Sequence, residues 1–404
     1  MSFASSRLAL VKPSASAWVS QTAKAAKARG EDVIDLGLGE PDFDTPNHIK
    51  EAAHQAALRG ETKYPPTNGT LEMRQAVLDK LKRENNLDYA LDEVIVSNGA
   101  KQVLFSALMA TLEPGDEVLL CAPYFGQYKD IVLILGGVPV PLECPAGAGF
   151  RLKPEQLSEA ITPKTRWLLL NQPSNPSGAV YSDAEIVSLG SVLADHERVL
   201  VLSDEIYEHI LFDGRIFRSF AALCPHLKDR TLTVNGVSKS YAMTGWRIGY
   251  GAGPMGLIAA MTKVQSQISS GACSIAQAAA AAALNGPQNE VRRFRAAFER
   301  RRDLVVARVA DIPGLTLDPP GGAFYGLIGC EALIGSTTHD GDTLASDADV
   351  TTYLLKAAGV AAVPGSAYDL SPFFRISTAA SEETLIKALD GIAKAVADLK
   401  GLRP

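Results

Sequence analysis

The sequence lacks several features that would assign it to a specialised class of protein. It has only five cysteines among 404 residues and no C-x-x-C pair, which indicates neither a disulfide framework nor a zinc knuckle. We therefore expect a reducing, cytoplasmic compartment. No apolar run reaches the roughly 18–20 residues that cross a bilayer, so no membrane association is predicted. Basic residues (39) are fewer than acidic ones (45), and the net charge of −6 makes nucleic acid a poor partner.

The first 30 residues also lack aspartate and glutamate. Their richness in serine, alanine and lysine is typical of a mitochondrial transit peptide, but we favour the alternative, an N-terminal arm and a first helix that ends near Gly30. The overall composition, 47% apolar and 21% charged, is that of a globular protein and excludes disorder, collagen and coiled coil. At about 150 residues per domain, the length predicts two domains.

Short apolar runs alternate with helical stretches between about residues 70 and 290. The runs are apolar throughout rather than at every second residue, which is typical of parallel strands buried on both faces. They lie at 94–97, 117–122, 167–171, 199–204, 231–235 and 247–253, and helical periods at 101–112, 183–196 and 255–268 lie between them. This pattern predicts an α/β fold, with a large domain whose mostly parallel sheet is covered by helices on both faces.

The pattern changes at about residue 291. A long charged helix, several short strands and a final helix from about residue 381 follow without strict alternation, which indicates a smaller α+β domain. We predict three segments: 1–45, the N-terminal arm and part of the small domain; 46–290, the large domain; and 291–404, the small C-terminal domain.

Groups able to do chemistry follow the ends of the predicted strands. The carboxyl ends of parallel strands meet at one edge of a sheet, where ligands bind in open α/β folds, so we expect these groups to lie together. They are a helix start at Gly99-Ala100-Lys101, an aromatic side chain at Phe125, an amide at Asn175, a carboxylate and a phenol at Asp204 and Tyr207, and an amine at Lys239.

Two cations belong to the segment that follows the strand at 231–235. Lys239 stands among small residues in a glycine-containing loop. A buried lysine has a lowered pKa and can act as a nucleophile that forms Schiff bases, whereas an exposed one is an ordinary surface charge. Arg247, eight residues further on, offers a guanidinium that could hold a phosphate through two hydrogen bonds.

Asp204 ends an apolar strand and allows two interpretations. It could cap a helix over the following residues. Alternatively, its carboxylate could face a protonated pyridine nitrogen, because an opposite charge so close shifts a pKa by about 1–3 units and keeps the ring cationic. Tyr207 lies three residues on and could hydrogen-bond the same ring.

Arg375 interrupts the apolar run FFRIS. Either it lies on an edge strand with its stem over the core, or it is a buried guanidinium that needs an anion. The next acidic residue in the sequence is Glu382. An incoming carboxylate would provide the missing anion.

The chain resembles the fold-type-I, pyridoxal-phosphate-dependent class I and II aminotransferases in six motifs that occur in the same order: SNGAKQ, APYFGQY, NQPSNPSGAVYS, SDEIYEHI, VNGVSKSYAMTGWRIGY and FFRIS. Within that family it is most similar to bacterial aspartate aminotransferases, which share the segments VKPSASAWV, GLGEPDFDTP and KYPPTNGTLEMRQAV. The resemblance extends from about Lys12 to the last helix. It also favours the N-terminal arm over a transit peptide.

The resemblance implies a homodimer that uses pyridoxal 5′-phosphate to move an amino group between an L-amino acid and a 2-oxo acid, one substrate after the other. Lys239 would bind the cofactor as a Schiff base and then move a proton. Asp204 would pair with the ring nitrogen, and Tyr207 and Asn175 would bond the ring hydroxyl. The remaining contacts would be ring stacking by Phe125, phosphate binding by Gly99, Ala100, Lys101 and Arg247, and a phosphate contact from Tyr64 of the other subunit.

The resemblance also implies a substrate site. Gly39, Asn175 and Arg375 would receive the α-carboxylate. Lys101, with the hydroxyl of Ser16, would face a second, distal carboxylate, which predicts aspartate and glutamate as substrates; otherwise Lys101 serves the phosphate or is solvated. Ser269 and Ser270 of the partner subunit would line the same pocket.

Three departures from the family pattern accompany these expectations. Phe125 stands where many relatives have tryptophan, Gly236 where some have a hydroxyl residue, and 377–380 reads Ser-Thr-Ala-Ala in place of Ser-Tyr-Ala-Thr. Alternatives that keep the cofactor are an aminotransferase of aromatic amino acids or prephenate, a β-lyase, a racemase or a decarboxylase. A non-catalytic sensor would need a DNA-binding segment, which the sequence does not indicate.

One motif argues for a different class of enzyme. Residues 251–256 match G-x-G-x-x-G, the dinucleotide fingerprint of nicotinamide-dependent dehydrogenases. That fingerprint also needs an acidic residue about 20 positions further on, and residues 257–289 contain none. Pro254 is more simply explained as the start of a helix.

Overall fold

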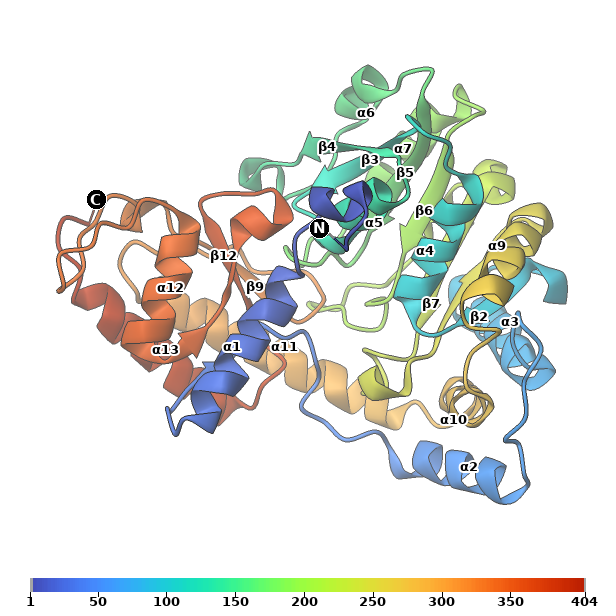
Figure 1. Cartoon of the computed structure of the whole chain (residues 1–404), viewed down its shortest axis with the longest axis horizontal. Coiled ribbons are helices and arrows are strands. Elements are labelled where there is room, and N and C mark those ends of the chain that lie inside the picture. Colours follow the sequence, from blue (N-terminus) through green and yellow to red (C-terminus); the bar gives the residue numbers. More distant parts are fainter. Residues whose placement is uncertain (1–2, 403–404) are drawn as a thin grey trace.

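A computed structural model describes residues 3–402 of the chain (Figure 1). The helices are α1 (Ala15–Ala28), α2 (Asn47–Leu58), α3 (Leu71–Asn85), α4 (Ala100–Thr111), α5 (Gln127–Ile134), α6 (Pro154–Ala160), α7 (Asp183–Ala194), α8 (Phe220–Leu223), α9 (Met255–Ile268), α10 (Ser274–Asn285), α11 (Asn289–Ala310), α12 (Asp347–Ala358) and α13 (Glu382–Ala397). The strands are β1 (Ile34–Asp35), β2 (Val94–Ser97), β3 (Glu117–Ala122), β4 (Val138–Glu143), β5 (Thr165–Asn171), β6 (Leu200–Asp204), β7 (Thr231–Gly236), β8 (Gly249–Ala252), β9 (Tyr325–Gly329), β10 (Val360–Ala361), β11 (Val363–Pro364) and β12 (Phe373–Ser377).

A seven-stranded sheet with the order β2-β8-β7-β6-β5-β3-β4 forms the centre of the molecule. Neighbouring strands are parallel from β7 to β4, whereas β8 is antiparallel to both β7 and β2. Each of the six predicted apolar runs overlaps one strand of this sheet. The predicted α/β class and mostly parallel sheet are therefore confirmed.

Strand β5 shows why these runs are apolar at every position. Successive side chains of a strand point to opposite faces of the sheet. Trp167 and Leu169 pack with residues of α4, α5 and α9 on one face, while Leu168 and Leu170 pack with α7 on the other. All four side chains are buried. Because β5 is covered on both faces, it carries apolar residues at successive positions rather than at every second one.

Strand β4 is the strand that the sequence pattern did not predict. Its sequence, VPVPLE, contains Pro139 and Pro141, which cannot donate backbone hydrogen bonds. The strand pairs only with β3 and forms the edge of the sheet, and the N–H of Val138 bonds to Asp116 at 2.8 Å on the β3 side. The prolines alternate with residues whose N–H groups face β3, so the proline nitrogens face the free edge of the sheet. A missing N–H donor is tolerated at that edge and blocks pairing with a further strand.

The C-terminal part of the chain forms smaller sheets. β11, β12 and β9 make an antiparallel sheet with β12 in the centre, and β1 pairs in parallel with β10, so a segment near the N-terminus joins this part. Figure 1 shows α1 between this group and the large sheet, with α11 running beneath both. Within residues 3–402, no helix is long and apolar enough to cross a membrane.

A buried polar network lies behind the turn that follows β6. Lys80 of α3 is fully buried, and its ammonium bonds the carboxylate of Glu208 and, at 2.6 Å, Asn85 Oδ1. Asn235 of β7 donates to the same Glu208 carboxylate at 2.7 Å. Burial opposes the charge of Glu208, but the charges of Lys80 and His209 and the hydrogen bonds from Lys80 and Asn85 together outweigh burial and lower the pKa of this carboxyl. Removing one partner of such a pair leaves an uncompensated buried charge, so the network fixes α3, the turn and β7 relative to one another.

Glu205, in the same turn, makes stability depend on pH. Burial first, and the nearby Glu208 second, raise the pKa of this carboxyl from 4.5 to about 7. The folded chain therefore holds the proton more tightly than the unfolded chain, and this stabilisation is lost as the pH rises from 4.5 through 7. The difference of two to three pKa units corresponds to about 3 kcal/mol.

We expect Glu205→Gln to remove this loss, because the amide cannot ionise and its oxygen can accept the hydrogen bonds that Ser203, Ser219 and Phe220 now donate. We measure the free energy of unfolding in urea at pH 5 and at pH 8. Between these two pH values it should fall by about 3 kcal/mol less in the variant than in the wild type. An equal fall in both proteins would contradict the assignment.

Candidate active site

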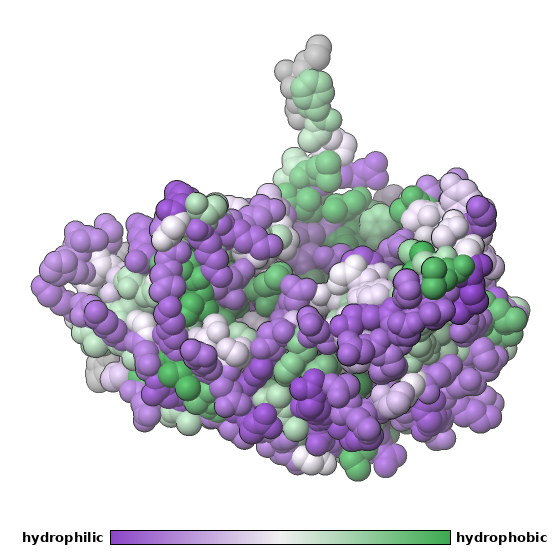
Figure 2. All heavy atoms as spheres, turned by 90° about the horizontal axis from the view of Figure 1, so that it is seen from below, coloured by the Kyte–Doolittle hydropathy of each residue, from purple (hydrophilic) through white to green (hydrophobic). Residues whose placement is uncertain are grey.

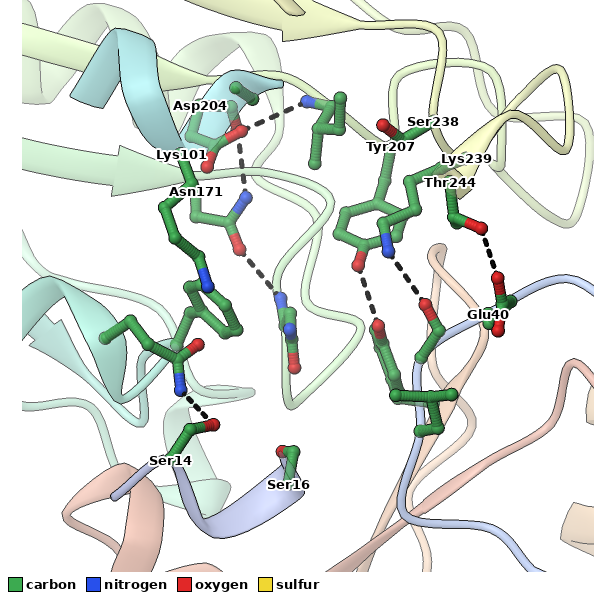
Figure 3. A pocket seen from close by; sticks show the side chains of 18 of the residues that line it. Ser14, Ser16, Glu40, Lys101, Asn171, Asp204, Tyr207, Ser238, Lys239 and Thr244 are labelled. Carbon is green, nitrogen blue, oxygen red and sulfur yellow. Dashed lines mark hydrogen bonds between the residues drawn. The ribbon is translucent and has the colours of Figure 1, made fainter. Parts of the chain in front are cut away.

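A cavity of about 370 Å³ opens at the carboxyl ends of the parallel strands, as the strand-end argument predicted (Figure 3). It brings together residues from the whole length of the chain. The predicted site residues that line it are Ser16, Gly39, Ala100, Lys101, Phe125, Asn175, Asp204, Tyr207, Lys239, Arg247 and Arg375.

The other predicted residues lie outside this lining. Gly99 is the residue before α4 and touches Arg247: a Cβ on it would come within 2.4 Å of Arg247 Nη2. Tyr64 is 93% exposed. Ser269 lies away from the lining, where its hydroxyl accepts a hydrogen bond from Gln102 at 2.8 Å.

Lys239 is held in the loop that follows β7. Its Nζ donates to the carbonyl oxygen of Gly39 at 2.7 Å (Figure 3). Burial, and then the positive charges of Arg375, Arg247 and Lys101, lower the pKa of the Lys239 ammonium to about 8. A substantial neutral fraction is therefore present in mildly alkaline solution, and a neutral amine is a nucleophile and a base.

Asp204 ends β6 with its side chain buried inside the cavity wall. Tyr128 donates to Oδ2 at 2.6 Å, and the backbone N–H of Ile206 donates to Oδ1 at 3.3 Å. Burial raises the pKa of the Asp204 carboxyl to about 6, against the opposing effects of these hydrogen bonds and of Lys239. Residues 206–209 form a turn and no helix, so the interpretation of Asp204 as a helix cap is wrong.

Tyr207 has a partner that the sequence analysis missed. Its hydroxyl lies 2.7 Å from the hydroxyl of Tyr325, which comes from the first residue of β9 and lines the same cavity. Tyr325 also explains the glycine at position 39, since a Cβ there would lie 2.0 Å from the Tyr325 hydroxyl. The run AFYGLIG around Tyr325 reads as an ordinary buried strand, and no local signal distinguishes this tyrosine.

Arg375 is 1% exposed and sits on β12, the central strand of its sheet, so the edge-strand interpretation is wrong. It donates to Asn175 Oδ1 at 2.9 Å and to the carbonyl oxygen of Gly37 at 2.5 Å. Its Nε has no partner, and its guanidinium pairs with no carboxylate among the residues that the structure describes. A buried guanidinium bonded only to neutral oxygens can still bind an anion.

The opposite side of the cavity is also positive. α4 begins at Ala100 and exposes the backbone N–H groups of its first turn, beside Lys101 and Arg247. Partial burial, and then the charge of Arg247, lower the pKa of Lys101, although the side chain keeps part of its surface exposed. In total, four cations and two carboxylates line the cavity. This arrangement suits a ligand with more than one negative charge.

Other residues of the lining also went unpredicted. Asn171 anchors two predicted residues: it donates to the backbone oxygen of Asp204 at 3.0 Å and accepts from the N–H of Asn175 at 2.8 Å. Ser238 and Tyr128 are further members. The G-x-G-x-x-G match at 251–256 is absent from the lining, because β8 is antiparallel and ends at the opposite edge of the sheet.

Known proteins share this architecture over nearly the whole chain. The profile of the family "Aminotransferase class I and II" matches residues 31–392. An aspartate aminotransferase of Rhizobium meliloti (strain 1021) is 56% identical over 92% of this chain and 91% of its own, and an aspartate/prephenate aminotransferase of Cereibacter sphaeroides is 50% identical over 96% and 97%. The solved structure of a Thermus thermophilus aspartate aminotransferase with maleate matches with a TM-score of 0.90 and 41% identity, over 98% of this chain and all of that one.

The cavity fits pyridoxal 5′-phosphate, the cofactor of this family. The first turn of α4, with Gly99 in front of it and two cations beside it, can bind a phosphate. Asp204 can face a ring nitrogen, and the buried amine of Lys239 can bond the aldehyde carbon. The chain therefore belongs to the class I and II aminotransferases and is a pyridoxal-phosphate-dependent enzyme that transfers amino groups.

Proposed function

We propose that the substrates of this aminotransferase are aspartate and glutamate with their 2-oxo acids. The observation that carries the proposal is the pair of cations, Arg375 and Lys101, which line one cavity without a carboxylate partner among the described residues. A dicarboxylic amino acid brings one carboxylate for each. The names of the aspartate aminotransferase relatives and the maleate in the Thermus structure support the same assignment.

The cofactor is held by three groups of residues. The N–H groups of Ala100 and Lys101 in the first turn of α4, with the side chains of Lys101 and Arg247, would hold the phosphate, since the N–H of Gly99 already bonds the carbonyl oxygen of Ser97 at 2.7 Å. Asp204 would keep the ring nitrogen protonated, and Phe125 would stack on the ring. Tyr207 and Asn175 would hold the ring hydroxyl. All of these residues line the cavity at the edge of the sheet where the parallel strands end.

Bound pyridoxal phosphate supplies the electron sink that makes the Cα proton of the substrate acidic. Lys239 is the base that removes this proton, and the protonated lysine gives the proton back in a later step. Its pKa of about 8 suits the role, because the neutral amine is available and its conjugate acid still gives the proton back. Arg375, Gly39 and Asn175 hold the α-carboxylate, and Ser16 supports Lys101 at the distal one.

Prephenate is a second candidate substrate. The Cereibacter relative carries it in its name, and prephenate has two carboxylates that the same two cations could bind. Both candidates are dicarboxylates, so both need the two cations. They differ in size, because prephenate contains a ring.

We also propose a cytoplasmic homodimer in which Tyr64 of each subunit contacts the phosphate of the other. Tyr64 is 93% exposed in the single chain. The N-terminal segment projects from the body and carries apolar side chains (Figure 2), and Phe3, Leu8 and Leu10 are exposed there. A second subunit would cover both features. The three segments 1–45, 46–290 and 291–404 are the domains of each subunit.

We expect Lys239→Ala to lower amino transfer from aspartate by about 10⁴-fold or more, because the variant loses both the base and the covalent attachment of the cofactor. The visible absorbance that the lysine-bound cofactor gives the wild type should disappear. Lys387→Ala, which removes an exposed lysine paired with Asp32, is the control and should keep both properties. Turnover at the normal rate in Lys239→Ala would end the proposed mechanism.

The two cations should differ in what they recognise. At saturating pyridoxal phosphate, which offsets the loss of the Lys101 contact to the phosphate, Lys101→Met should lower kcat/KM for aspartate by about 10-fold and leave kcat/KM for alanine nearly unchanged, because only aspartate has a distal carboxylate. Arg375→Leu should lower kcat/KM for both aspartate and alanine by about 100-fold or more, because both carry an α-carboxylate and the arginine is buried. Steady-state kinetics with the two amino acids measures both effects, and equal losses in Lys101→Met would remove it from side-chain recognition.

A hybrid dimer tests the role of Tyr64. Tyr64→Phe should raise the dissociation constant of the cofactor about 10-fold through loss of one hydrogen bond to a charged group. Pairing a Tyr64→Phe chain with a Lys239→Ala chain should regenerate one native site per dimer, with half the wild-type activity at limiting cofactor. If the hybrid instead binds as weakly as the Tyr64→Phe homodimer, Tyr64 serves its own subunit.

A further inference from the structure

A buried hydroxyl outside the predicted set touches the carboxylate of Asp204. Tyr128, on the first turn of α5, is 1% exposed and donates to Asp204 Oδ2 at 2.6 Å. The second oxygen, Oδ1, accepts the backbone N–H of Ile206 at 3.3 Å. Within residues 3–402, Tyr128 is the one side chain that donates to this carboxylate, since Asn171 bonds the backbone oxygen of Asp204.

The charges around this contact keep Tyr128 a donor. The titratable side chains that face Asp204 are Tyr128 from α5, Tyr207 from the turn after β6 and Lys239 from the loop after β7. Burial first, and then the negative charge of Asp204, raise the pKa of the Tyr128 hydroxyl far above its usual value. The hydroxyl therefore stays protonated, and its hydrogen bond favours the ionised form of Asp204 against the effect of burial.

The same side chain also supports the residue assigned to ring stacking. The rings of Phe125 and Tyr128 meet edge to face, with centroids 5.5 Å apart and planes at 78°. A single residue of α5 thus contacts both the aromatic side chain and the carboxylate between which a pyridine ring would be held. Its ring and its hydroxyl can be tested separately, because phenylalanine at this position keeps the ring contact and removes only the hydrogen bond.

We propose that Tyr128 is a positioning residue that holds Asp204 charged and oriented toward the ring nitrogen of pyridoxal phosphate. The inference rests on the role proposed above for Asp204. Without the hydroxyl, Asp204 attracts the proton that it shares with the ring nitrogen more strongly. The ring then carries less positive charge and draws electrons less from the substrate Cα.

The test compares Tyr128→Phe with Tyr181→Phe in the holoenzyme. Tyr181 is a matched control, because it is also buried and its hydroxyl accepts a hydrogen bond, from Leu152 N–H at 2.9 Å, but it does not line the cavity. In Tyr128→Phe we expect kcat for aspartate to fall about 10-fold with KM within about twofold, while Tyr181→Phe stays near the wild type. Thermal unfolding midpoints should be similar in the two variants.

A pH titration of the visible absorbance gives a readout that a structural role would not move. When the ring carries less positive charge, the nitrogen that Lys239 contributes is easier to protonate. The midpoint pH of the absorbance titration should therefore rise by up to about one pH unit in Tyr128→Phe and stay unchanged in Tyr181→Phe. Incorporation of 3-fluorotyrosine at position 128 keeps the shape of the ring and makes the hydroxyl a stronger donor. The midpoint should then move the other way.

An unmoved midpoint in Tyr128→Phe and in the fluorinated protein overturns the proposal, even if kcat falls, because the loss would then be structural. If Tyr128→Phe does not fold, the fluorinated protein alone decides. Failure of the proposed function is separate: a wild type that does not use aspartate refutes the substrate assignment, whereas the titration needs only the bound cofactor.

Discussion

The site depends on four cations that form no salt bridge with a carboxylate among the described residues, and two of these cations, Lys101 and Arg247, remain exposed. Arg375 is the extreme case, because its buried guanidinium bonds only neutral oxygens, from Asn175, Gly37 and more distantly Ser16. Burying a charge costs several kcal/mol, and neutral acceptors repay part of that cost. A carboxylate that enters the cavity finds a partner that needs no further desolvation. Burial first, and then the same excess of positive charge, lower the pKa of Lys239, so the cations that bind the substrate also contribute to the base strength of this lysine.

The fold can hold this arrangement because the groups sit at strand ends backed by buried structure. Parallel strands deliver Asp204 and the Lys239 loop to one edge. Behind them, the Lys80–Glu208 pair fixes the turn that carries Tyr207, and Ser240, next to Lys239, lies 3.2 Å from His209 of the same turn. The pairing of β1 with β10 joins the N-terminal segment that carries Gly39 to the part of the chain that carries Arg375. The cavity is therefore bounded by segments that cannot shift independently.

What the sequence could predict follows from how local each signal is. Asp204 and Lys239 were found because each directly follows an apolar run, and the end of a buried strand is visible in the sequence. Tyr128 and Tyr325 were missed because their roles arise only in three dimensions: the Tyr128 hydroxyl meets a carboxylate 76 residues away, and the Tyr325 hydroxyl meets a phenol 118 residues away. Strand β4 was missed for the opposite reason, since its prolines are a strong local signal against a strand, which an edge position overrides.

The different exposure of the two substrate cations sets how selective this site can be. An unmet charge on Arg375 is desolvated, so with Arg375 in its proposed role we expect every substrate to need an α-carboxylate. Lys101 keeps contact with solvent, and an exposed ion pair is worth only about 0–1 kcal/mol before the substrate closes the site off from water. An amino acid without a distal carboxylate thus leaves Lys101 hydrated rather than stranded. Preference for dicarboxylates on this chain is consequently graded, and a larger second substrate such as prephenate is limited by shape more than by charge.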